Sequence, residues 1–316
     1  MIIRFFDEKR HCGPTAPKGV EDLYLQGRQI LMKIALFGRS TGARTVAGVC
    51  SLEACLSKRG VDTVFLSGGE ARWSDLPDDT DMLLSLGGDG TYLDSVALVR
   101  GRDIPVAGIN FGRLGFLTTV QASEDGFPWV DDLLAGNYTV EERDLLRVRP
   151  EEGAFDSQFH PFAANEISIQ RQGTCMLSID VLIDGRPLPT YWADGIVVAT
   201  PTGSTAYSLS VGGPVVLPSS KVLILAPVAP HNLNVRPLVV PITSVISLSF
   251  RSREEKAVLT VDNRSTVIES GARFVISKGE YGFRHVSLSD DNFINALRTK
   301  LLWGEDKRNA DNGREK

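Results

Sequence analysis

Leu83 to Thr91 reads Leu-Leu-Ser-Leu-Gly-Gly-Asp-Gly-Thr, and the expected fold of the chain is built around this stretch. An apolar run stops at two glycines, and a helix-like pattern over residues 92–99 begins directly afterwards. We therefore expect a buried strand that ends where a helix begins. At such a junction the first N–H groups of the helix have no intrahelical partner, and the helix dipole favours an anion. The candidate phosphate-binding loop consists of Gly87, Gly88, Gly90 and Thr91, with Thr91 as the expected N-cap.

Asp89 is the unusual member of this loop, because a carboxylate repels phosphate. Its position indicates a role toward a proton or a metal ion. The alternative interpretation is an ordinary tight turn in which Asp89 is an Asx-type turn residue. The loop is not a Walker A motif, since no Gly-Lys-Ser/Thr follows, and its glycine spacing differs from the dinucleotide-binding fingerprint.

Length and composition limit the possible classes of protein. A chain of 316 residues is long enough for about two domains with hydrophobic cores. The net charge of −5 argues against nucleic acid or an anionic membrane as the main partner. No apolar run approaches the roughly 18 residues of a membrane span, and residues 1–10 lack the apolar core of a signal peptide. The cysteines have neither zinc nor disulfide spacing, so we expect reduced thiols in a cytoplasmic protein.

The first half of the chain alternates strand and helix patterns. Strands are expected at residues 34–37, 61–66, 83–86 and 104–109, and helices after the first strand, after the third, and at 123–135. This alternation predicts a parallel sheet covered by helices. Ligands of such sheets bind at the carboxyl ends of the strands. The loops that begin at Gly38, Gly87 and Asn110 would then share one edge.

The pattern changes after Gly136 to short β-rich runs separated by turns, which predicts an all-β second domain. The runs are residues 166–170, 177–183, 195–199, 222–225, 238–240, 245–250, 258–261 and 274–276. Residues 291–303 have a helical pattern that we expect to pack back on the first domain. The predicted organisation is a loosely ordered leader (1–31), an α/β domain (32–137, completed by 289–303), an all-β domain (138–288) and a polar tail (304–316). Deleting the leader is expected to leave activity intact.

A second group of polar residues lies in the all-β part. The segment Thr200–Ser210 is dense in hydroxyl groups, which suit a sugar, phosphate or amide ligand. The alternative is a Ser/Thr-rich surface loop of no function. Asn165 and Glu166 stand at the head of a strand, where such a pair can hold ribose hydroxyls or an adenine edge, although the dipeptide alone carries no signal.

Together these motifs resemble the NAD kinase family in order and spacing. The matching motifs are Gly87–Thr91, Gly112-x-x-Gly115-Phe116, Asn165-Glu166, Asp194-Gly195, Thr200–Ser210, Gly212-Gly213-Pro214, Pro230-His231 and Arg236-Pro237-Leu238. The resemblance covers about Met32 to Trp303. Gly-Gly-Asp-Gly alone is shared with diacylglycerol kinases, sphingosine kinases and phosphofructokinases, whereas the Thr200–Ser210 loop is specific.

The resemblance implies transfer of a phosphoryl group from ATP, or sometimes polyphosphate, to the 2′-hydroxyl of the adenosine ribose of NAD. It also implies a divalent metal, usually Mg²⁺, and a homodimer or homotetramer. The α/β domain becomes the nucleotide-binding domain and the all-β domain the NAD-binding domain. Asp89 becomes the proton acceptor, which agrees with the need of a ribose hydroxyl for a general base.

The implied NAD contacts come from both domains. Phe116 would line the adenine pocket, and Asn165 and Glu166 would hold the ribose and diphosphate. Asp194 and the run from Thr205 would hold the nicotinamide half and second adenine-side contacts. The implied NAD-binding residues are Asp89, Gly90, Phe116, Asn165, Glu166, Asp194, Thr205, Ala206, Tyr207, Ser208, Leu209 and Ser210.

Three positions depart from the family pattern. Arg264 stands where the family often carries Gln, Trp192 where it often carries a basic residue, and Leu217 near the place of a common histidine. Arg113 and Arg236 lie in matching loops, but solvated surface arginines are the simpler interpretation of both. Two other functions are weighed against the kinase. A lipid kinase of the diacylglycerol kinase type gives no reason for the Thr200–Ser210 loop, and a non-catalytic dinucleotide sensor gives none for Asp89.

Overall fold

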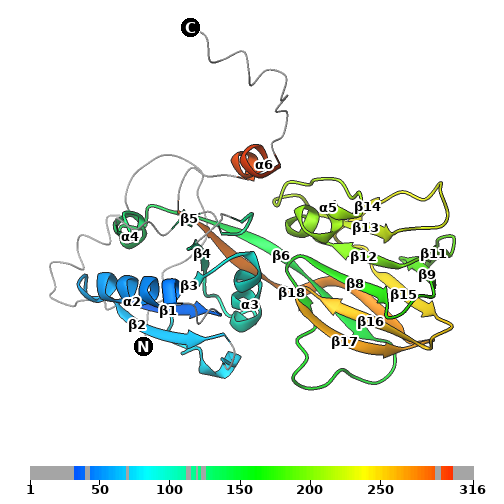
Figure 1. Cartoon of the computed structure of the whole chain (residues 1–316), viewed down its shortest axis with the longest axis horizontal. Coiled ribbons are helices and arrows are strands. Elements are labelled where there is room, and N and C mark those ends of the chain that lie inside the picture. Colours follow the sequence, from blue (N-terminus) through cyan, green and yellow to red (C-terminus); the bar gives the residue numbers. More distant parts are fainter. Residues whose placement is uncertain are drawn as a thin grey trace, which may run out of the picture.

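The computed structural model describes residues 32–39, 43–68, 71–111, 115–118, 120–121, 126–288 and 293–301. Two lobes stand side by side in Figure 1, one with helices around a parallel sheet and one made almost wholly of strands. The expected leader and polar tail lie outside the described residues. The lobes agree with the expected α/β and all-β parts, and the C-terminal helix is present.

The first lobe is a parallel sheet whose strands lie in the order β2-β1-β3-β4. All of its strand pairs are parallel. The sheet reverses its direction of growth between β1 and β3, and ligands of open α/β sheets bind at such a point. The strands are β1 (Lys33–Gly38), β2 (Asp62–Ser67), β3 (Met82–Leu86), β4 (Val106–Asn110) and the short β5 (Val120–Gln121).

Helices cover both faces of this sheet. Successive side chains of each strand point to opposite faces, so strands of continuous apolar sequence present an apolar surface to helices on either side. Ile34 and Leu36 pack under one face with α2 (Ala43–Ser57) and α4 (Trp129–Leu134). Ala35 and Phe37 pack on the other face with α3 (Asp89–Val99). A short 3₁₀ turn, Trp73–Asp75, follows β2. Strands buried on both faces explain the continuous apolar run before Gly87.

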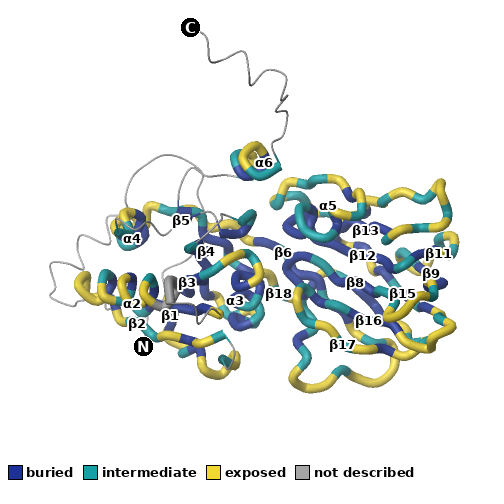
Figure 2. Tube along the Cα trace, in the orientation of Figure 1, coloured by how far each residue is buried: buried dark blue, intermediate teal, exposed yellow. Residues whose placement is uncertain are grey.

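The second lobe is a sandwich of antiparallel strands around one core. Its separate six-stranded sheet has the order β14-β13-β12-β8-β16-β17. These strands are β8 (Glu166–Arg171), β12 (Gly195–Ala199), β13 (Val222–Val228), β14 (Leu238–Pro241), β16 (Lys256–Val261) and β17 (Arg264–Glu269). Facing it are β6 (Thr139–Pro150), β7 (Phe162–Ala163), β9 (Leu177–Ile183), β10 (Arg186–Pro187), β11 (Tyr191–Ala193), β15 (Ile246–Arg251) and β18 (Arg273–Ser287). Side chains of both sheets share one buried cluster, which Figure 2 shows as the dark interior of this lobe.

A continuous sheet joins the two lobes. The last residues of β18 pair in parallel with β4, while the rest of β18 pairs with β15 and β6 of the sandwich. Therefore β18 passes from one lobe into the other. The border expected at residue 138 stays a prediction. The helix α6 (Phe293–Leu301) lies above the junction of the lobes.

Several expectations differ from the structure in detail, and the short strands β5, β7, β10 and β11 were not expected either. The N-cap of α3 is Gly88, and Thr91 is the third helical residue, so the expected N-cap at Thr91 is wrong. The helix expected at 123–135 spans Trp129–Leu134, and 122–125 lie outside the described residues. Strands β6 and β17 were not expected, and β18 is far longer than the run at 274–276. The second lobe also holds a 3₁₀ turn, Thr202–Thr205, and the short helix α5 (Tyr207–Ser210).

Candidate active site

The carboxylate of Asp89 is held by the loop that follows β4. Its Oδ1 accepts hydrogen bonds from Leu117 N at 3.1 Å and from Thr118 N and Oγ1 at 3.1 and 3.0 Å. Its Oδ2 accepts one from Phe116 N at 2.7 Å. A Cβ at Gly115 would overlap Asp89 Oδ1, so only glycine fits there. The Gly115-Phe116 part of the motif thus has a physical reason: it brings backbone donors onto Asp89.

The two oxygens of the Asp89 carboxylate accept unequal numbers of hydrogen bonds from the described residues. An ionised carboxylate offers about four lone-pair sites on two oxygens. Oδ1 accepts from three donors, whereas Oδ2 accepts from one among the described residues. Oδ2 can therefore accept one more hydrogen bond, such as that of a hydroxyl group. Donors from the loop also fix the carboxylate before any ligand arrives.

The glycine-rich loop forms the first turn of α3, as expected for an anion site. Asp89 is the first residue of this 11-residue helix, and Thr91 N donates to Gly88 O at 2.9 Å. A Cβ at Gly87 would come within 2.5 Å of Thr91 Oγ1, so the close packing of this turn requires glycine. Around Gly88 an added Cβ would meet no atom of the described residues within 4 Å.

Phe116 connects the loop to the C-terminal helix. Its ring lies 6.2 Å from that of Phe293, and Lys300 Nζ lies 5.0 Å from its centroid. Phe293 and Lys300 belong to α6, so this helix does return to the first lobe. The same loop residue therefore contacts α6 with its ring and Asp89 with its backbone N–H.

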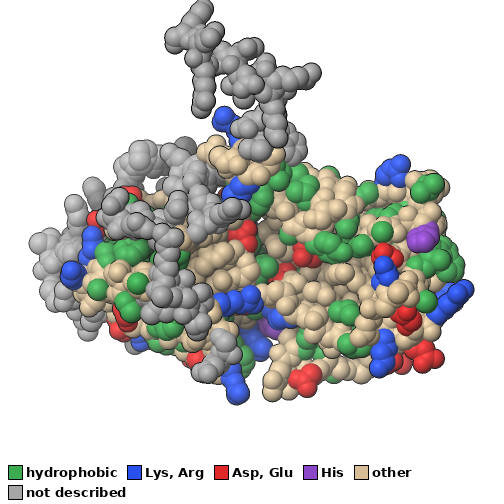
Figure 3. Space-filling model, in the orientation of Figure 1, with side chains coloured by type: hydrophobic (Ala, Val, Ile, Leu, Met, Phe, Trp, Pro, Cys, Tyr) green, Lys and Arg blue, Asp and Glu red, His purple; other side chains and the backbone are tan. Residues whose placement is uncertain are grey.

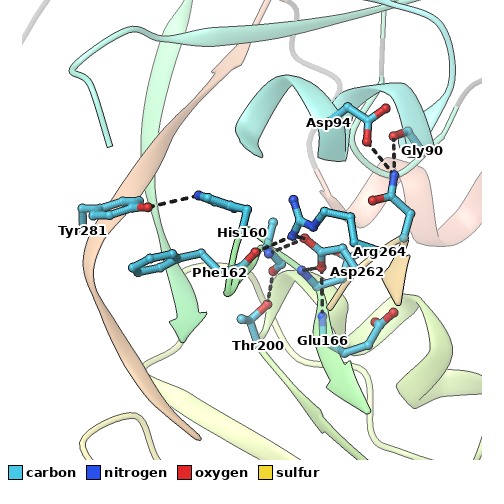
Figure 4. A network of polar contacts seen from close by, with 12 residues as sticks. Gly90, Asp94, His160, Phe162, Glu166, Thr200, Asp262, Arg264 and Tyr281 are labelled. Carbon is cyan, nitrogen blue, oxygen red and sulfur yellow. Dashed lines mark hydrogen bonds and ion pairs between the residues drawn. The ribbon is translucent and has the colours of Figure 1, made fainter. Parts of the chain in front are cut away.

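Asp262 orders the Asn165-Glu166 segment in the second lobe. Its buried carboxylate accepts hydrogen bonds from the backbone N–H groups of Ala164, Asn165 and Glu166 at 2.9, 2.8 and 3.2 Å. Asp262 lies in the tight turn between β16 and β17 with φ of 52°, a region that Asp tolerates better than most residues. Figure 4 shows this carboxylate at the centre of a polar network that reaches both lobes.

Glu166 is a largely buried carboxyl group whose Oε2 has no hydrogen-bond partner among the described residues. Burial raises its pKa from 4.5 to about 8, and the Asp262 carboxylate adds to this shift while the N–H of Tyr207 opposes it. At neutral pH this carboxyl is therefore mainly protonated. A neutral carboxyl can donate a hydrogen bond and does not repel a diphosphate.

The hydroxyl-rich segment from Thr200 folds into tight turns, and several of its hydroxyls serve the fold. Thr200 Oγ1 donates to Ala164 O at 2.6 Å, and Ser204 Oγ bonds both N–H and C=O of Val216. A Cβ at Gly203 would overlap Asn165 O. These contacts fix the segment against the Asn165-Glu166 strand. These contacts give the segment a structural role, and its role toward a ligand stays a prediction.

Asp194 and Tyr207 border a cavity of about 330 Å³. Asp194 Oδ1 accepts from Arg171 Nε at 2.8 Å, and both side chains are about one-third exposed. Burial, followed by the charges of Asp194 and Glu166, raises the pKa of Tyr207. Three of the expected NAD contacts therefore lie close together, because the charges of Asp194 and Glu166 act on the Tyr207 hydroxyl.

The other expected residues lie around these groups. Gly90 and Phe116 lie at Asp89, whereas Thr205 Oγ1 bonds Thr202 O at 3.4 Å within its own turn. Ser208 is buried and packed closely against Gly213. Ala206, Leu209 and Ser210 complete the turn and α5.

Arg113 and Arg236 are the two arginines in loops that match the family motifs. Arg113 lies outside the described residues. Arg236 Nη1 donates to Leu233 O and Val235 O at 2.8 Å, so it is engaged by its own exposed loop. Trp192 and Leu217, two of the departures, are exposed at 46% and 50%.

Sequence reasoning did not assign a role to Thr118, Asp262, Asn263 or Arg39. Arg39 directly follows β1, at the edge where ligands were expected, and this position could have drawn attention to it. The Asp-Asn pair between two β-rich runs could have been interpreted as a tight hairpin. Nothing in the sequence pattern links Thr118 to a carboxylate 29 residues earlier.

No group of three or more His, Cys, Asp or Glu side chains among the described residues could hold a metal ion. None of the helices in the described ranges combines the length and the hydropathy of a membrane span.

Comparison with known proteins decides the family. Residues 73–138 match the ATP-NAD kinase N-terminal domain, and residues 164–288 match the ATP-NAD kinase C-terminal domain. The chain belongs to the NAD kinase family. The NAD kinases of Flavobacterium psychrophilum and Bacteroides fragilis are 38% and 39% identical to it, over 88% of this chain and 100% of each relative. This family consists of phosphotransferases.

Solved structures agree with this assignment to the NAD kinase family. A yeast NADH kinase complexed with NADH superposes with a TM-score of 0.77 at 24% identity, covering 87% of this chain and 89% of that one, which shows the fold. An Archaeoglobus fulgidus NAD kinase in complex with ATP has a TM-score of 0.69 at 25% identity, covering 84% and 97%.

Proposed function

We propose that this chain transfers the terminal phosphoryl group of ATP to the 2′-hydroxyl of the adenosine ribose of NAD, which yields NADP and ADP. The observation that supports this reaction is the position of Asp89. Its carboxylate stands at the start of a helix beside the switch point of the sheet, and Oδ2 accepts one hydrogen bond from the described residues. The first turn of α3 supplies N–H groups for phosphate oxygens.

In this proposal Asp89 Oδ2 accepts the proton of the ribose hydroxyl. The hydroxyl oxygen then forms a bond to the terminal phosphorus, and the bond from that phosphorus to the ADP oxygen breaks. General-base assistance contributes roughly 10²–10⁴-fold. Positioning and charge stabilisation contribute most of the remainder in phosphoryl transfer.

The NAD contacts follow from the two ordered segments. We assign the ribose and diphosphate to Asn165 and Glu166, because Asp262 fixes their backbone and Glu166 is neutral at pH 7. We assign the adenine to Phe116, whose loop also holds Asp89. The nicotinamide half and second adenine-side contacts are assigned to Asp194 and residues 205–210, next to the cavity at Tyr207.

A divalent cation, Mg²⁺ in the first instance, belongs to the proposal as a partner of ATP. The described residues offer no preformed cluster of ligands for it. Mg²⁺ is commonly bound by one or two carboxylates together with substrate phosphates, so ATP would bring most of its ligands. The cation would neutralise charge on the phosphates. A cytoplasmic location and a homodimer or homotetramer are further parts of the proposal.

One assay tests the proposed reaction against its alternatives. The purified chain is incubated with ATP, Mg²⁺ and either NAD or diacylglycerol, and NADP and phosphatidic acid are quantified. We expect NADP alone. Phosphatidic acid without NADP would make the chain a lipid kinase, and NAD binding without any product would make it a sensor.

A further inference from the structure

A second and larger cavity, of about 510 Å³, lies beside α3 and is strongly basic. Its charged lining consists of four arginines and one aspartate: Arg39, Arg72, Arg100, Arg264 and Asp94. A volume of this size is typical of small-molecule sites. In Figure 3 basic side chains gather next to a histidine where the two lobes meet. Arg39 forms an ion pair with Asp94, so Arg72, Arg100 and Arg264 carry the net positive charge that favours a polyanion.

The cavity lies at the edge of the sheet where ligands were expected. Phe37 and Arg39 come from the carboxyl end of β1, and Gly68 follows β2. An added Cβ at Gly90 would lie 3.7 Å from Arg39 Nη1, so the cavity adjoins the residue after Asp89. A phosphate chain bound here could therefore extend to the first turn of α3.

Arg264 brings a weakly compensated positive charge to this cavity. Its side chain is 22% exposed, and Nη2 donates to Phe162 O at 2.5 Å. Nε and Nη1 are shielded from water and have no hydrogen-bond partner among the described residues. The nearest described carboxylate, Asp262 Oδ2 at 3.7 Å, already accepts a backbone hydrogen bond from Ala164. A buried cation that lacks full compensation strengthens the attraction of a nearby anion.

His160 and Arg100, which also line the cavity, are consistent with a positive potential inside it. Burial lowers the pKa of His160 to about 3, and the charges of Arg264 and Arg100 add to the shift. Arg100 lies over the ring of Trp73 at 5.3 Å, so one wall of the cavity combines a cation with an aromatic face. Figure 4 shows the Arg264 side chain reaching from the hairpin of the second lobe toward Phe162 and His160.

We infer that this cavity binds the triphosphate chain of the phosphoryl donor and that Arg264 is its central cation. The inference rests on the proposed function in taking the ligand to be a donor. The donor would reach α3 from the Arg39 side, while the dinucleotide occupies the Glu166 and Tyr207 side. The triphosphate chain can belong to a nucleoside triphosphate or to inorganic polyphosphate, and the cavity chemistry serves both.

The test measures binding of inorganic tripolyphosphate to the full chain by calorimetry. We expect Arg264→Gln to weaken binding at least about tenfold, because the variant loses charge-assisted hydrogen bonds to the anion. Arg100→Gln, at a partly exposed site that does not support the core, should weaken binding at least about threefold. Arg253→Gln, an exposed change at the opposite end of β16, should leave binding within about twofold.

The same variants are compared in steady-state assays with ATP and NAD. We expect KM for ATP to rise in Arg264→Gln and Arg100→Gln with KM for NAD unchanged. Unchanged tripolyphosphate binding in Arg100→Gln and in folded Arg264→Gln would overturn the inference, as would a change confined to KM for NAD. If Arg264→Gln does not fold, Arg100→Gln alone decides in the same way.

Two further results distinguish a nucleoside triphosphate from inorganic polyphosphate as the ligand, and failure of the anion site from failure of the proposed function. A loss of ATP affinity but not of tripolyphosphate affinity in Trp73→Ala supports a nucleoside triphosphate, and equal affinity for both ligands supports inorganic polyphosphate. If the unmodified chain produces no NADP from any donor, the proposed function fails. Arginine-dependent tripolyphosphate binding would still support the anion site on its own.

Discussion

The side-chain amide of Asn263 spans the two lobes: its Nδ2 donates to Asp94 Oδ1 at 2.8 Å and to Gly90 O at 3.3 Å. Asn263 lies in the hairpin turn of the second lobe, and both acceptors belong to α3. The preceding residue, Asp262, orders the Asn165-Glu166 backbone. One turn therefore fixes the helix that carries Asp89 relative to the segment proposed to hold NAD (Figure 4).

We expect Asn263→Ala to lower kcat about tenfold while the melting temperature changes little. The variant loses two exposed hydrogen bonds, worth about 1 kcal/mol each, but no core contact. Misplacement of Asp89 affects the reacting geometry more than binding, so KM for NAD should change less than kcat. The measurement is steady-state kinetics together with thermal unfolding.

A matched control for this change is Asn137→Ala. Asn137 also donates from Nδ2 to an aspartate, Asp132 at 3.3 Å, in an exposed turn after α4. We expect its kcat to stay within about twofold of the unmodified chain. Equal losses in both variants would refute a positioning role for Asn263.

We expect Asp89→Asn to reduce turnover by at least about two orders of magnitude, because the amide cannot accept the ribose proton. The structure adds a second consequence. An amide NH₂ next to Phe116 N would place two donors together, so one hydrogen bond to the loop is lost. The loop should become less ordered, which amide hydrogen exchange at residues 115–118 measures.

Asp78→Asn is the control, since that side chain is fully exposed and bonds Arg102 only at 3.5 Å. It should leave turnover and exchange unchanged. Turnover retained in Asp89→Asn would identify another base, and Glu166 would then be the first group to test.

The sequence pattern predicted the glycine loop and the parallel strands well because both obey local rules. An apolar run that ends at glycines before a helix needs no distant partner to be interpreted. Strand β6 escaped prediction because its first four residues are exposed and include two glutamates, which hides the alternation of apolar residues. Strand β18 contains a bulge between Lys278 and Gly282 that interrupts its pattern.

Long-range hydrogen bonds were the least predictable part of the site. The Asp89 carboxylate was expected to face a ligand, but its geometry is set by donors from Phe116 to Thr118. Asp262 acts on a segment 96 to 98 residues earlier. Neither relationship leaves a periodic signal, because each depends on which loops the sheets bring together.

We expect Tyr207→Ala to raise KM for NAD about tenfold and to leave KM for ATP within about twofold. Tyr207 borders the cavity at Asp194, whereas the basic cavity that we assign to the donor has other walls. Tyr207→Phe keeps the ring and should cost less, since the hydroxyl lies 3.5 Å from Gln170 Oε1 and contributes a weak hydrogen bond. An effect of Tyr207→Ala confined to ATP would show that this segment holds the other substrate.

Glu166 should make both stability and NAD binding depend on pH. Burial and the Asp262 charge raise the pKa of Glu166 from 4.5 to about 8, so folding takes up a proton between these values. The free energy of unfolding should therefore fall as the pH rises from about 4.5 to about 8, by a few kcal/mol at most. Above pH 8 the ionised carboxyl also repels the NAD diphosphate.

Glu166→Gln keeps a neutral group at every pH and should remove both effects. We expect its KM for NAD to stay nearly constant between pH 7 and 9, whereas that of the unmodified chain rises. Its melting temperature should exceed that of the unmodified chain at pH 9 and approach it near pH 5. The exposed Glu152→Gln should follow the unmodified chain at all pH values. If Glu166→Gln lost NAD binding at pH 7, a neutral side chain would not be sufficient at this position. The ionised carboxylate would then be the form that binds NAD, against our expectation.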